Sequence, residues 1–308
     1  MENEDIHKLV TNIEKVIVGK TETVKLLIIG LLTNGHILIE DIPGLGKTML
    51  ALALAKSISA QFKRIQATPD LLPTDITGGF VYSPKTGEFD FRKGPVFANI
   101  LLVDEINRTT PRTQSALLEC MQEYKVTIEG TPFILPWPFM TIATQNPIEY
   151  QGTYALPEAQ IDRFLMKINM GYPSAQEEAK IVSGQKIKHP VEDVMPVMTL
   201  ESVLKLQEQV KNIQISPTVL EYIISLVALT RKSTALKQGA SPRASIAIMK
   251  ASCAWAFIEG RDYVIPEDVI KLLPCILKHR IVLHPKAIIS GTTPELVIEG
   301  ILKQTSIS

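Results

Sequence analysis

Eight residues at positions 41–48 have the types and spacing to bind a phosphate chain. They read Asp-Ile-Pro-Gly-Leu-Gly-Lys-Thr, the P-loop pattern G-x-x-x-x-G-K-[ST] with Asp41 in place of the first glycine. Gly44 and Gly46 let the backbone curl so that its N–H groups point at phosphate oxygens, and a following helix would add its dipole. Lys47 would reach the β- and γ-phosphates, and the Thr48 hydroxyl would coordinate Mg²⁺. A carboxylate disfavours triphosphate binding unless its side chain points away, so the sequence does not decide how Asp41 affects affinity.

Two acids follow the apolar residues 100–103, at the end of a second buried segment. Asp104 is suited to holding Mg²⁺ through the metal's water shell, because this hard cation dehydrates reluctantly. Glu105 is then placed to orient and polarise an attacking water molecule. Asn146 follows a third apolar segment, 139–144, and its side chain would emerge beside the phosphates.

The elements that must position these residues alternate along the first half of the chain. Apolar runs at 36–40, 99–103 and 139–144 are separated by helical patterns, which indicates an α/β fold with a parallel sheet covered on both faces. Residues 66–94 are rich in Pro and Gly and predict an inserted loop and hairpin. A second hairpin is expected over residues 125–135.

The pattern changes to helices after residue 173, and we find no convincing strand beyond it. Helices are expected at 199–210, 217–231, 241–259 and 266–278. A chain of 308 residues also exceeds the usual size of one core. We therefore predict a nucleotide-binding domain at 1–173 and a smaller all-helical domain at 174–308.

Composition narrows the functional classes. Lys plus Arg and Asp plus Glu both number 32, so the balanced charge gives no support for a broad nucleic-acid surface. No apolar run approaches the length of a membrane span, and the first residues do not resemble a signal peptide. Three scattered cysteines indicate buried free thiols. We expect a cytoplasmic protein.

With these motifs in hand, the sequence closely resembles the MoxR-type AAA+ ATPases. The resemblance runs from about Val18 to His279-Arg280, nearly the whole chain. DEINR at 104–108 together with TQSALLE at 113–119 is much more specific than the P-loop alone. The segments that carry the resemblance are 40–48, 94–99, 104–108, 113–119 and 156–164.

The resemblance implies an AAA+ core followed by a helical lid, with the helix-2 insert of this clade before Gly94. Asn146 would be the sensor-1 residue. Arg163 would be the arginine finger acting in trans on the neighbouring subunit's γ-phosphate, and Arg243 the sensor-2 arginine of the lid. Val18 and Gly19 would contact the adenine. The expected nucleotide-binding set is Val18, Gly19, Pro43, Gly44, Leu45, Gly46, Lys47, Thr48 and Met49.

The same resemblance implies ATP and Mg²⁺ as cofactors and a homo-oligomer, most simply a hexameric ring. It also implies a protein partner with a von Willebrand A domain and chaperone-like remodelling, assembly or activation of partner proteins. Three alternatives stay open from the sequence: a DNA-handling AAA+ motor, a nucleotide-switched scaffold with little turnover, and a small-molecule kinase. Salt-sensitive DNA binding would favour the first, a single-turnover assay tests the second, and the third lacks a nameable acceptor site.

Overall fold

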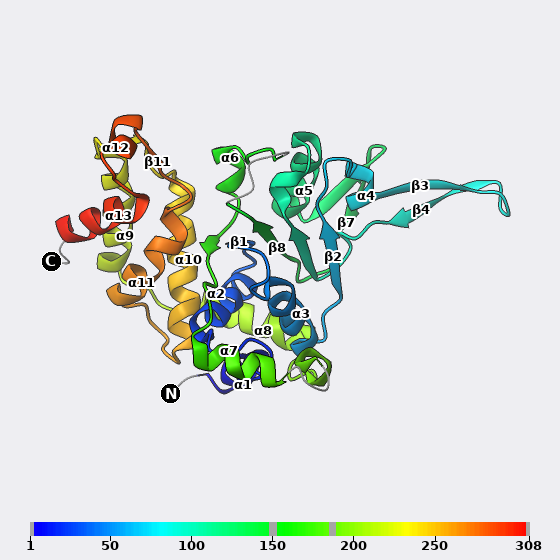
Figure 1. The fold of residues 1–308 in the computed structure, drawn as a ribbon, viewed down its shortest axis with the longest axis horizontal. Helices are drawn as coiled ribbons and strands as arrows, with labels where there is room; N and C mark the ends of the chain where they lie inside the picture. Colours follow the sequence, from blue (N-terminus) through cyan, green and yellow to red (C-terminus); the bar gives the residue numbers. More distant parts are fainter. Residues whose placement is uncertain (1–2, 148–152, 185–188, 306–308) are drawn as a thin grey trace.

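The computed structural model describes residues 3–147, 153–184 and 189–305, and a five-stranded parallel sheet lies at its centre (Figure 1). The strand order is β2-β5-β8-β1-β9. The strands are β1 (Ile37–Glu40), β2 (Phe62–Gln66), β5 (Ile100–Asp104), β8 (Met140–Gln145) and β9 (Met166–Ile168). The α/β class predicted from the apolar runs is confirmed.

The sheet has two strands more than the three apolar runs predicted. They are its edges, β2 and β9. β2 has only one buried residue among five, and β9 is three residues long. An edge strand is covered less than a central one, so its sequence does not form the continuous apolar run that reveals a buried strand.

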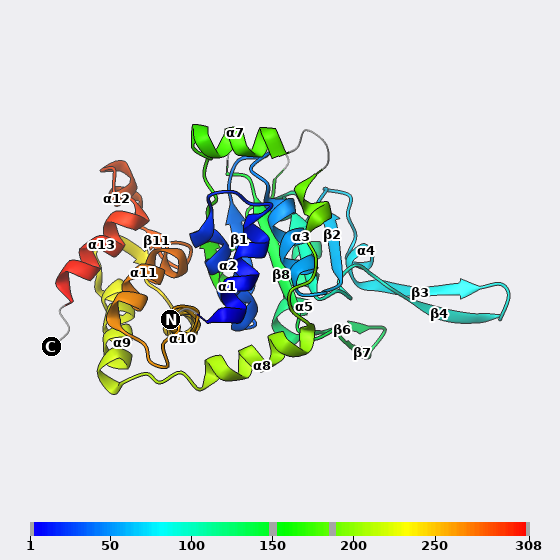
Figure 2. The same ribbon diagram turned by 90° about the horizontal axis from the view of Figure 1, so that it is seen from below.

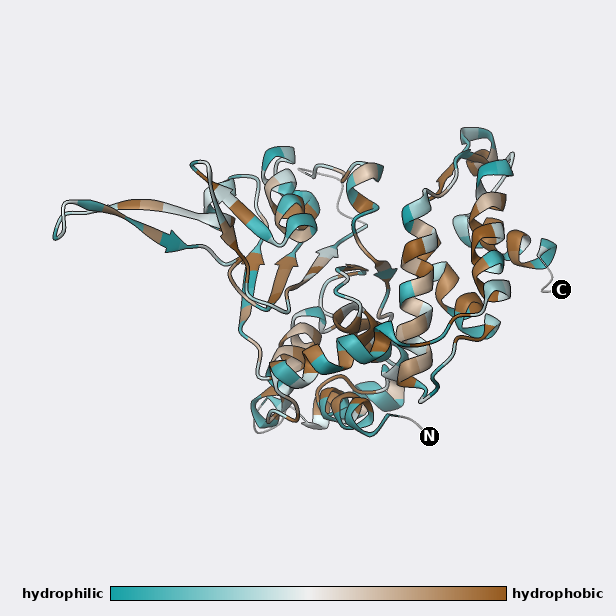
Figure 3. Cartoon of the chain, turned by 180° about the vertical axis from the view of Figure 1, so that it is seen from behind, coloured by the Kyte–Doolittle hydropathy of each residue, from teal (hydrophilic) through white to brown (hydrophobic). Residues whose placement is uncertain are grey.

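Both faces of the sheet are covered. Alternate side chains divide between two hydrophobic clusters, so that Ile37 and Ile39 of β1 belong to one and Leu38 to the other. The first face packs against three helices, α1 (Glu4–Glu14), α2 (Thr21–Leu32) and α3 (Lys47–Ser57). The opposite face is covered by α5 (Pro111–Glu123). Figure 3 shows the strands as a largely hydrophobic layer.

Both predicted hairpins are present. β3 (Gly78–Ser83) and β4 (Glu88–Lys93) follow the short helix α4 (Pro73–Thr77) and project away from the body (Figures 1 and 2). β6 (Lys125–Ile128) and β7 (Thr131–Ile134) are joined by Glu129 and Gly130, both with positive φ, the geometry of a tight hairpin turn.

The second half is helical, with one correction. The four predicted helices are α8 (Leu200–Lys211), α9 (Pro217–Lys232), α10 (Pro242–Ile258) and α11 (Pro266–Leu277). The second half also contains α7 (Ala175–Gly184), α13 (Pro294–Gln304) and the short α12 (Pro285–Ile289) and η2 (Pro190–Asp193). The short α6 (Glu158–Ile161) and η1 (Ile106–Arg108) belong to the first half. The expectation of no strands in the second half was wrong: β10 (Leu236–Gln238) pairs with β11 (Val282–Leu283). Strands of three and two residues are too short to show a pattern.

α8 determines where the later helices lie. α7 and α8 lie at opposite ends of the sheet-bearing part, and α8 leads the chain to α9 (Figure 2). The Gln207 side chain of α8 donates to the Leu31 carbonyl (2.7 Å) and to Asn34 Oδ1 (2.8 Å), just before β1. The helices α10 and α11 pack beside the edge strand β9 and helix α2, within a hydrophobic cluster shared with α1–α3. The first turn of α10 lies toward the amino end of β9, because Ser241 bonds Asp162. A domain boundary near residue 173 stays a prediction.

Among the described residues, no helix combines the length and apolar character needed to cross a membrane.

Candidate active site

The P-loop joins β1 to α3 as its spacing predicts. Gly44 and Gly46 have φ of 88° and 86°, values that an L side chain rarely adopts. Gly46 is the N-cap of α3, and its carbonyl accepts from Leu50 N at 2.9 Å. The helix dipole therefore points at the loop, which is the usual arrangement for an anion site.

A cavity of about 310 Å³ opens over this loop and gathers most of the residues expected to act there. Asp104, Glu105 and Asn146 come to it from the ends of β5 and β8. Its lining is Pro43, Gly44, Gly46, Lys47, Thr48, Met49, Arg64, Gln66, Asp104, Glu105, Thr144 and Asn146. The carboxyl ends of parallel strands meet at this edge, so residues far apart in sequence converge.

The Lys47 side chain lines this cavity. Nζ donates to the main-chain carbonyl of Asp41 at 2.5 Å. Burial lowers the pKa of Lys47, while the nearby negative charges of Asp41, Asp104 and Glu105 act in the opposite direction. Phosphate oxygens would satisfy this partly buried cation better than one carbonyl does.

The two acids are held by different partners. Asp104 Oδ2 accepts from Arg64 Nε at 2.6 Å, and Oδ1 accepts from the Thr144 hydroxyl at 3.3 Å. Glu105 has φ of 59°, and its N–H donates to Thr144 Oγ1 at 2.9 Å. This left-handed residue turns the chain sharply after β5, and strained residues of this kind are common at functional sites.

Sequence reasoning missed three residues of this cavity, Arg64, Gln66 and Thr144. Thr144 lies in the apolar run that predicted β8, but nothing in that run marked its hydroxyl as a partner of the two acids. Gln66 Nε2 donates to Glu105 Oε2 at 3.2 Å, as does Arg108 NH1. Arg64 and Gln66 are two residues apart on β2, so their side chains lie on the same face of that strand. Recognition of β2 would have revealed them.

The oxygens present fit a magnesium ion that is shared with phosphates. Thr48 and Asp104 both line the cavity and offer the hard oxygen ligands that Mg²⁺ prefers. Within the described ranges, no group of three or more His, Cys, Asp or Glu side chains could hold a metal alone. Mg²⁺ is commonly bound by one or two carboxylates together with substrate phosphates, so this donor set suffices.

The segment expected to contact the adenine flanks the P-loop. A Cβ added to Gly46 would lie 3.8 Å from Ile17 Cδ1, which brings residue 17 against the loop. Val18 is half-buried and Gly19 exposed. Neither Val18, Gly19 nor Leu45 lines the cavity over the loop, so their contact with nucleotide stays a prediction.

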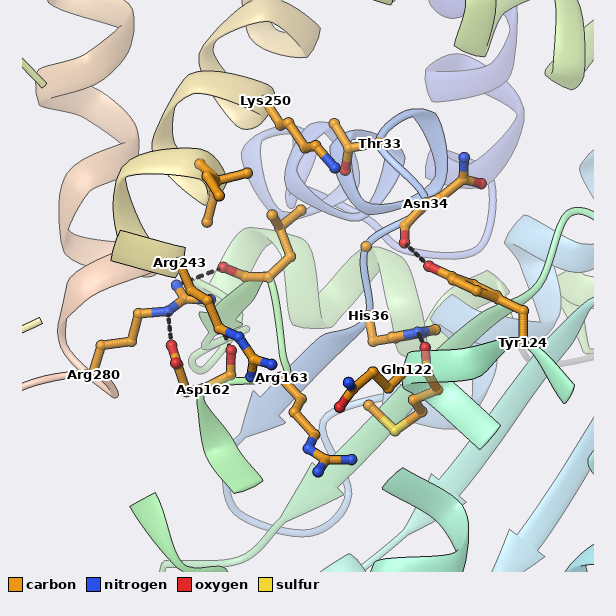
Figure 4. A pocket seen from close by; sticks show the side chains of 15 residues that line it. Thr33, Asn34, His36, Gln122, Tyr124, Asp162, Arg163, Arg243, Lys250 and Arg280 are labelled. Atoms are coloured by element: carbon orange, nitrogen blue, oxygen red, sulfur yellow. Dashed lines mark hydrogen bonds and ion pairs between the residues drawn. The ribbon is translucent and has the colours of Figure 1, made fainter. Parts of the chain in front are cut away.

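Arg163 and Arg243 lie elsewhere, in a second pocket of about 220 Å³ (Figure 4). That pocket is also lined by His36 and Leu165, which stand just before β1 and β9, whereas the P-loop follows β1. The pocket is therefore at the amino ends of the strands. The sensor-2 role implied for Arg243 requires contact with nucleotide, but the structure does not bring Arg243 to the P-loop cavity of its own chain.

Asp162 precedes Arg163 in the chain and bonds the first turn of the helix that carries Arg243. Its Oδ1 accepts from Arg280 Nε at 2.7 Å (Figure 4). Its Oδ2 accepts from the Ser241 hydroxyl at 3.1 Å. Ser241 is the N-cap of α10, so this bond places the first turn of that helix, with Arg243, beside Arg163. Arg163 NH1 donates to the Leu118 carbonyl at 2.9 Å, and its buried Nε has no hydrogen-bond partner within the described part of the chain.

Comparisons with known proteins identify the family of the chain. Residues 36–166 match the family described as ATPase family associated with various cellular activities (AAA), and residues 228–301 match the AAA lid domain. The chain is 43% identical to the chaperone MoxR1 of Mycobacterium tuberculosis, over 98% of this chain and 82% of the relative. It is 50% identical to the uncharacterized protein YeaC of Bacillus subtilis, over 99% of this chain and 96% of the relative.

A solved structure shares the whole fold. The crystal structure of a candidate ATPase from Cytophaga hutchinsonii matches with a TM-score of 0.92 at 41% identity, covering 99% of this chain and 95% of that one. The sheet, the P-loop and the helical region define a AAA-type ATPase fold. Within that class, the chain belongs to the MoxR-type AAA+ ATPase family.

Proposed function

We propose that this chain is a magnesium-dependent cytoplasmic ATPase that hydrolyses ATP to ADP and phosphate. The observation that carries the proposal is the cavity in which the P-loop meets Asp104, Glu105 and Asn146. Lys47 binds the β- and γ-phosphates, and Thr48 with Asp104 holds Mg²⁺, which neutralises phosphate charge. Glu105 orients and polarises the attacking water. Asn146 contacts the γ-phosphate.

The site is completed by a neighbouring subunit. The P-loop cavity has its own Arg64, but Arg163 and Arg243 lie at the other edge of the sheet. Both can reach a γ-phosphate if the amino edge of one subunit docks on the carboxyl edge of the next. Such a head-to-tail contact closes into a ring or continues as a filament. From the resemblance to the MoxR-type ATPases we propose a ring, most simply a hexamer. This arrangement makes Arg243, like Arg163, a residue that acts in trans.

The energy of hydrolysis drives chaperone-like remodelling, assembly or activation of partner proteins. Support comes from the relatives that are named chaperone MoxR1 and MoxR. The proposed partner carries a von Willebrand A domain.

The test is a magnesium-dependence and concentration-dependence assay. Phosphate release should require Mg²⁺, stop with EDTA, and rise in specific activity with protein concentration as subunits assemble. Glu105→Gln measured in parallel guards against a contaminating ATPase. Hydrolysis that persists in Glu105→Gln, or none in the assembled wild type, would refute the proposal.

A further inference from the structure

Asp41, which occupies the first position of the P-loop, is bonded to a distant part of the chain. Its Oδ2 accepts from the main-chain N–H groups of Met170 (2.5 Å) and Gly171 (2.9 Å). Its Oδ1 accepts from Ile42 N at 3.2 Å. The carboxylate is thereby occupied by three backbone donors, which offset its charge and hold it in one direction.

The two donors belong to the linker that leaves the sheet. β9 ends at Ile168 and α7 begins at Ala175, so residues 169–174 join the core to the helical part. Gly171 has φ of 65°, a left-handed conformation. Successive N–H groups around a left-handed residue point to the same side and form an anion-binding concavity. Here the anion is the side chain of Asp41.

The same linker also contacts the segment expected to bind the adenine. Lys20 Nζ donates to the Tyr172 carbonyl at 2.9 Å. A Cβ on Gly19 would overlap the Glu177 carboxylate, so this side chain of α7 lies directly on Gly19. Glu177 is fixed in turn, because its Oε2 accepts from Ser174 N at 2.7 Å. The linker and the first turn of α7 thus touch both segments that would hold a nucleotide.

Lys47 completes the connection on the phosphate side. Its Nζ binds the carbonyl of Asp41, the same residue whose carboxylate holds the linker. When Lys47 turns to a phosphate, the Asp41 carbonyl loses its donor, and any shift of residue 41 that follows is passed to the amides of Met170 and Gly171 through the carboxylate. A change at the phosphates therefore reaches the linker through one residue.

We propose that Asp41 is a positioning residue that couples occupancy of the P-loop to the linker 169–174 and hence to α7. The inference rests on the proposed function for the identity of the ligand, ATP. It explains why an acid stands at the start of the loop: the carboxylate faces the linker instead of the phosphates. The first residue of the loop serves to transmit the nucleotide state.

The test measures the two donor amides directly. Hydrogen exchange at Met170 and Gly171 is followed at single-amide resolution in full-length wild type, Asp41→Ala and Asp41→Asn. Hydrogen bonds to a charged acceptor protect strongly, so Asp41→Ala should speed exchange at both amides about tenfold or more. Asp41→Asn keeps one oxygen acceptor and should restore most of the protection.

Glu40→Ala is the matched control. Glu40 is the preceding residue and pairs with Lys167 of β9 at 2.5 Å, so its loss loosens the same two strands without removing an acceptor for residues 170 and 171. Exchange at the two amides should stay near the wild-type rate in this variant. Far-UV circular dichroism and thermal unfolding identify any variant that fails to fold, in which case Asp41→Asn and Asp41→Gly carry the comparison.

The second arm adds a non-hydrolysable ATP analogue. Wild type should change its exchange at Met170 and Gly171 on binding, whereas Asp41→Ala should bind the analogue but show no such change. Wild-type-like exchange in Asp41→Ala, or a nucleotide response that persists there, would overturn the inference. If wild type itself binds no nucleotide, the proposed function fails instead, and the two failures are distinguishable.

Discussion

Asp104 and Arg64 face each other across the neighbouring strands β5 and β2, with 2.6 Å between Oδ2 and Nε. The guanidinium therefore occupies one of the two carboxylate oxygens that would serve Mg²⁺ through its water shell, and we expect the two cations to compete. We predict that Arg64→Ala lowers the Mg²⁺ concentration needed for half-maximal binding of an ATP analogue. Arg64 is half exposed, so the half-saturating Mg²⁺ concentration should fall by no more than about fivefold, as for a surface ion pair.

Lys63→Ala is the control, because Lys63 is adjacent to Arg64 in the chain and its side chain points to the opposite face of β2. Titrations with Mg²⁺ at fixed analogue concentration give the half-saturation values. A higher Mg²⁺ requirement in Arg64→Ala would mean that the arginine assists the metal or the phosphates instead of competing.

Binding and hydrolysis should separate between Lys47 and Glu105. Lys47→Ala removes a charged phosphate contact and should weaken ATP binding about tenfold to hundredfold. Glu105→Gln keeps the shape of the side chain and loses only the charge that polarises water. It should therefore bind ATP normally and hydrolyse it about 10²–10⁴ times more slowly. Calorimetry with ATP and single-turnover phosphate release measure the two quantities, and equal losses of affinity would contradict these roles.

The motif-bearing parts of this fold were predictable from local pattern. The P-loop, its flanking strand and helix, and the acids after β5 are each defined within ten residues of sequence. Arg64 and Gln66 were missed because the signal for an edge strand is weak when few of its side chains are buried. Asp41 could be recognised as a departure, but its partners are 129 and 130 residues away, and only the fold brings them together.

The position of Arg243 relative to the sheet could not be predicted from local sequence either. Its motif placed it correctly at the start of a helix, because Ser241 and Pro242 are strong N-terminal signals. Nothing local to that helix reveals which end of the sheet it meets. That is decided by α8, which leads the chain to α9, and by the bonds of Gln207 and Asp162.

The buried imidazole of His36 makes stability depend on pH. Its Nε2 donates to the Met121 carbonyl (2.8 Å), and its Nδ1 accepts from Thr141 N (3.0 Å), so the neutral ring satisfies both partners. Burial lowers the pKa of His36 from 6.5 to about 4, with the Met121 bond acting slightly against it. Below pH 6.5 the unfolded chain gains a proton that the folded chain does not. At about 1.4 kcal/mol per pH unit, the free energy of unfolding should fall by about 3 kcal/mol between pH 6.5 and 4.

His36→Gln isolates this contribution. The amide can imitate the contact to Met121 but does not titrate, so the variant should be less stable near pH 8 and lose less on acidification. Urea unfolding of both proteins at half-unit pH steps gives the difference, in which the contributions of the shared carboxylates cancel. Parallel pH curves for the two proteins would show that His36 is not kept neutral in the folded state.

Mixed assemblies test whether Arg163 and Arg243 both act on a neighbour. Each of Arg163→Ala, Arg243→Ala and Lys47→Ala should hydrolyse poorly alone, since a trans arginine can supply a factor of roughly 10³–10⁵ in rate. Mixing Arg163→Ala with Lys47→Ala should restore part of the activity, because an intact P-loop borrows its arginine from a Lys47→Ala neighbour. Arg243→Ala with Lys47→Ala should recover in the same way if Arg243 acts in trans. An arginine that served its own P-loop would give no recovery there.

Mixing Arg163→Ala with Arg243→Ala gives the opposite outcome and so decides between the two arrangements. If both arginines project from the same edge onto the next subunit, every site in such a mixed ring lacks one of them, and activity should stay near the level of the single variants. If Arg243 instead served its own nucleotide, an Arg163→Ala subunit would keep its own Arg243 and borrow Arg163 from an Arg243→Ala neighbour, so activity would return. Size-exclusion chromatography of differently tagged subunits verifies that the variants co-assemble. Recovery in this last mixture, together with none in the Arg243→Ala and Lys47→Ala mixture, would assign Arg243 to its own subunit and require α10 to move from the position that Asp162 and Ser241 now hold.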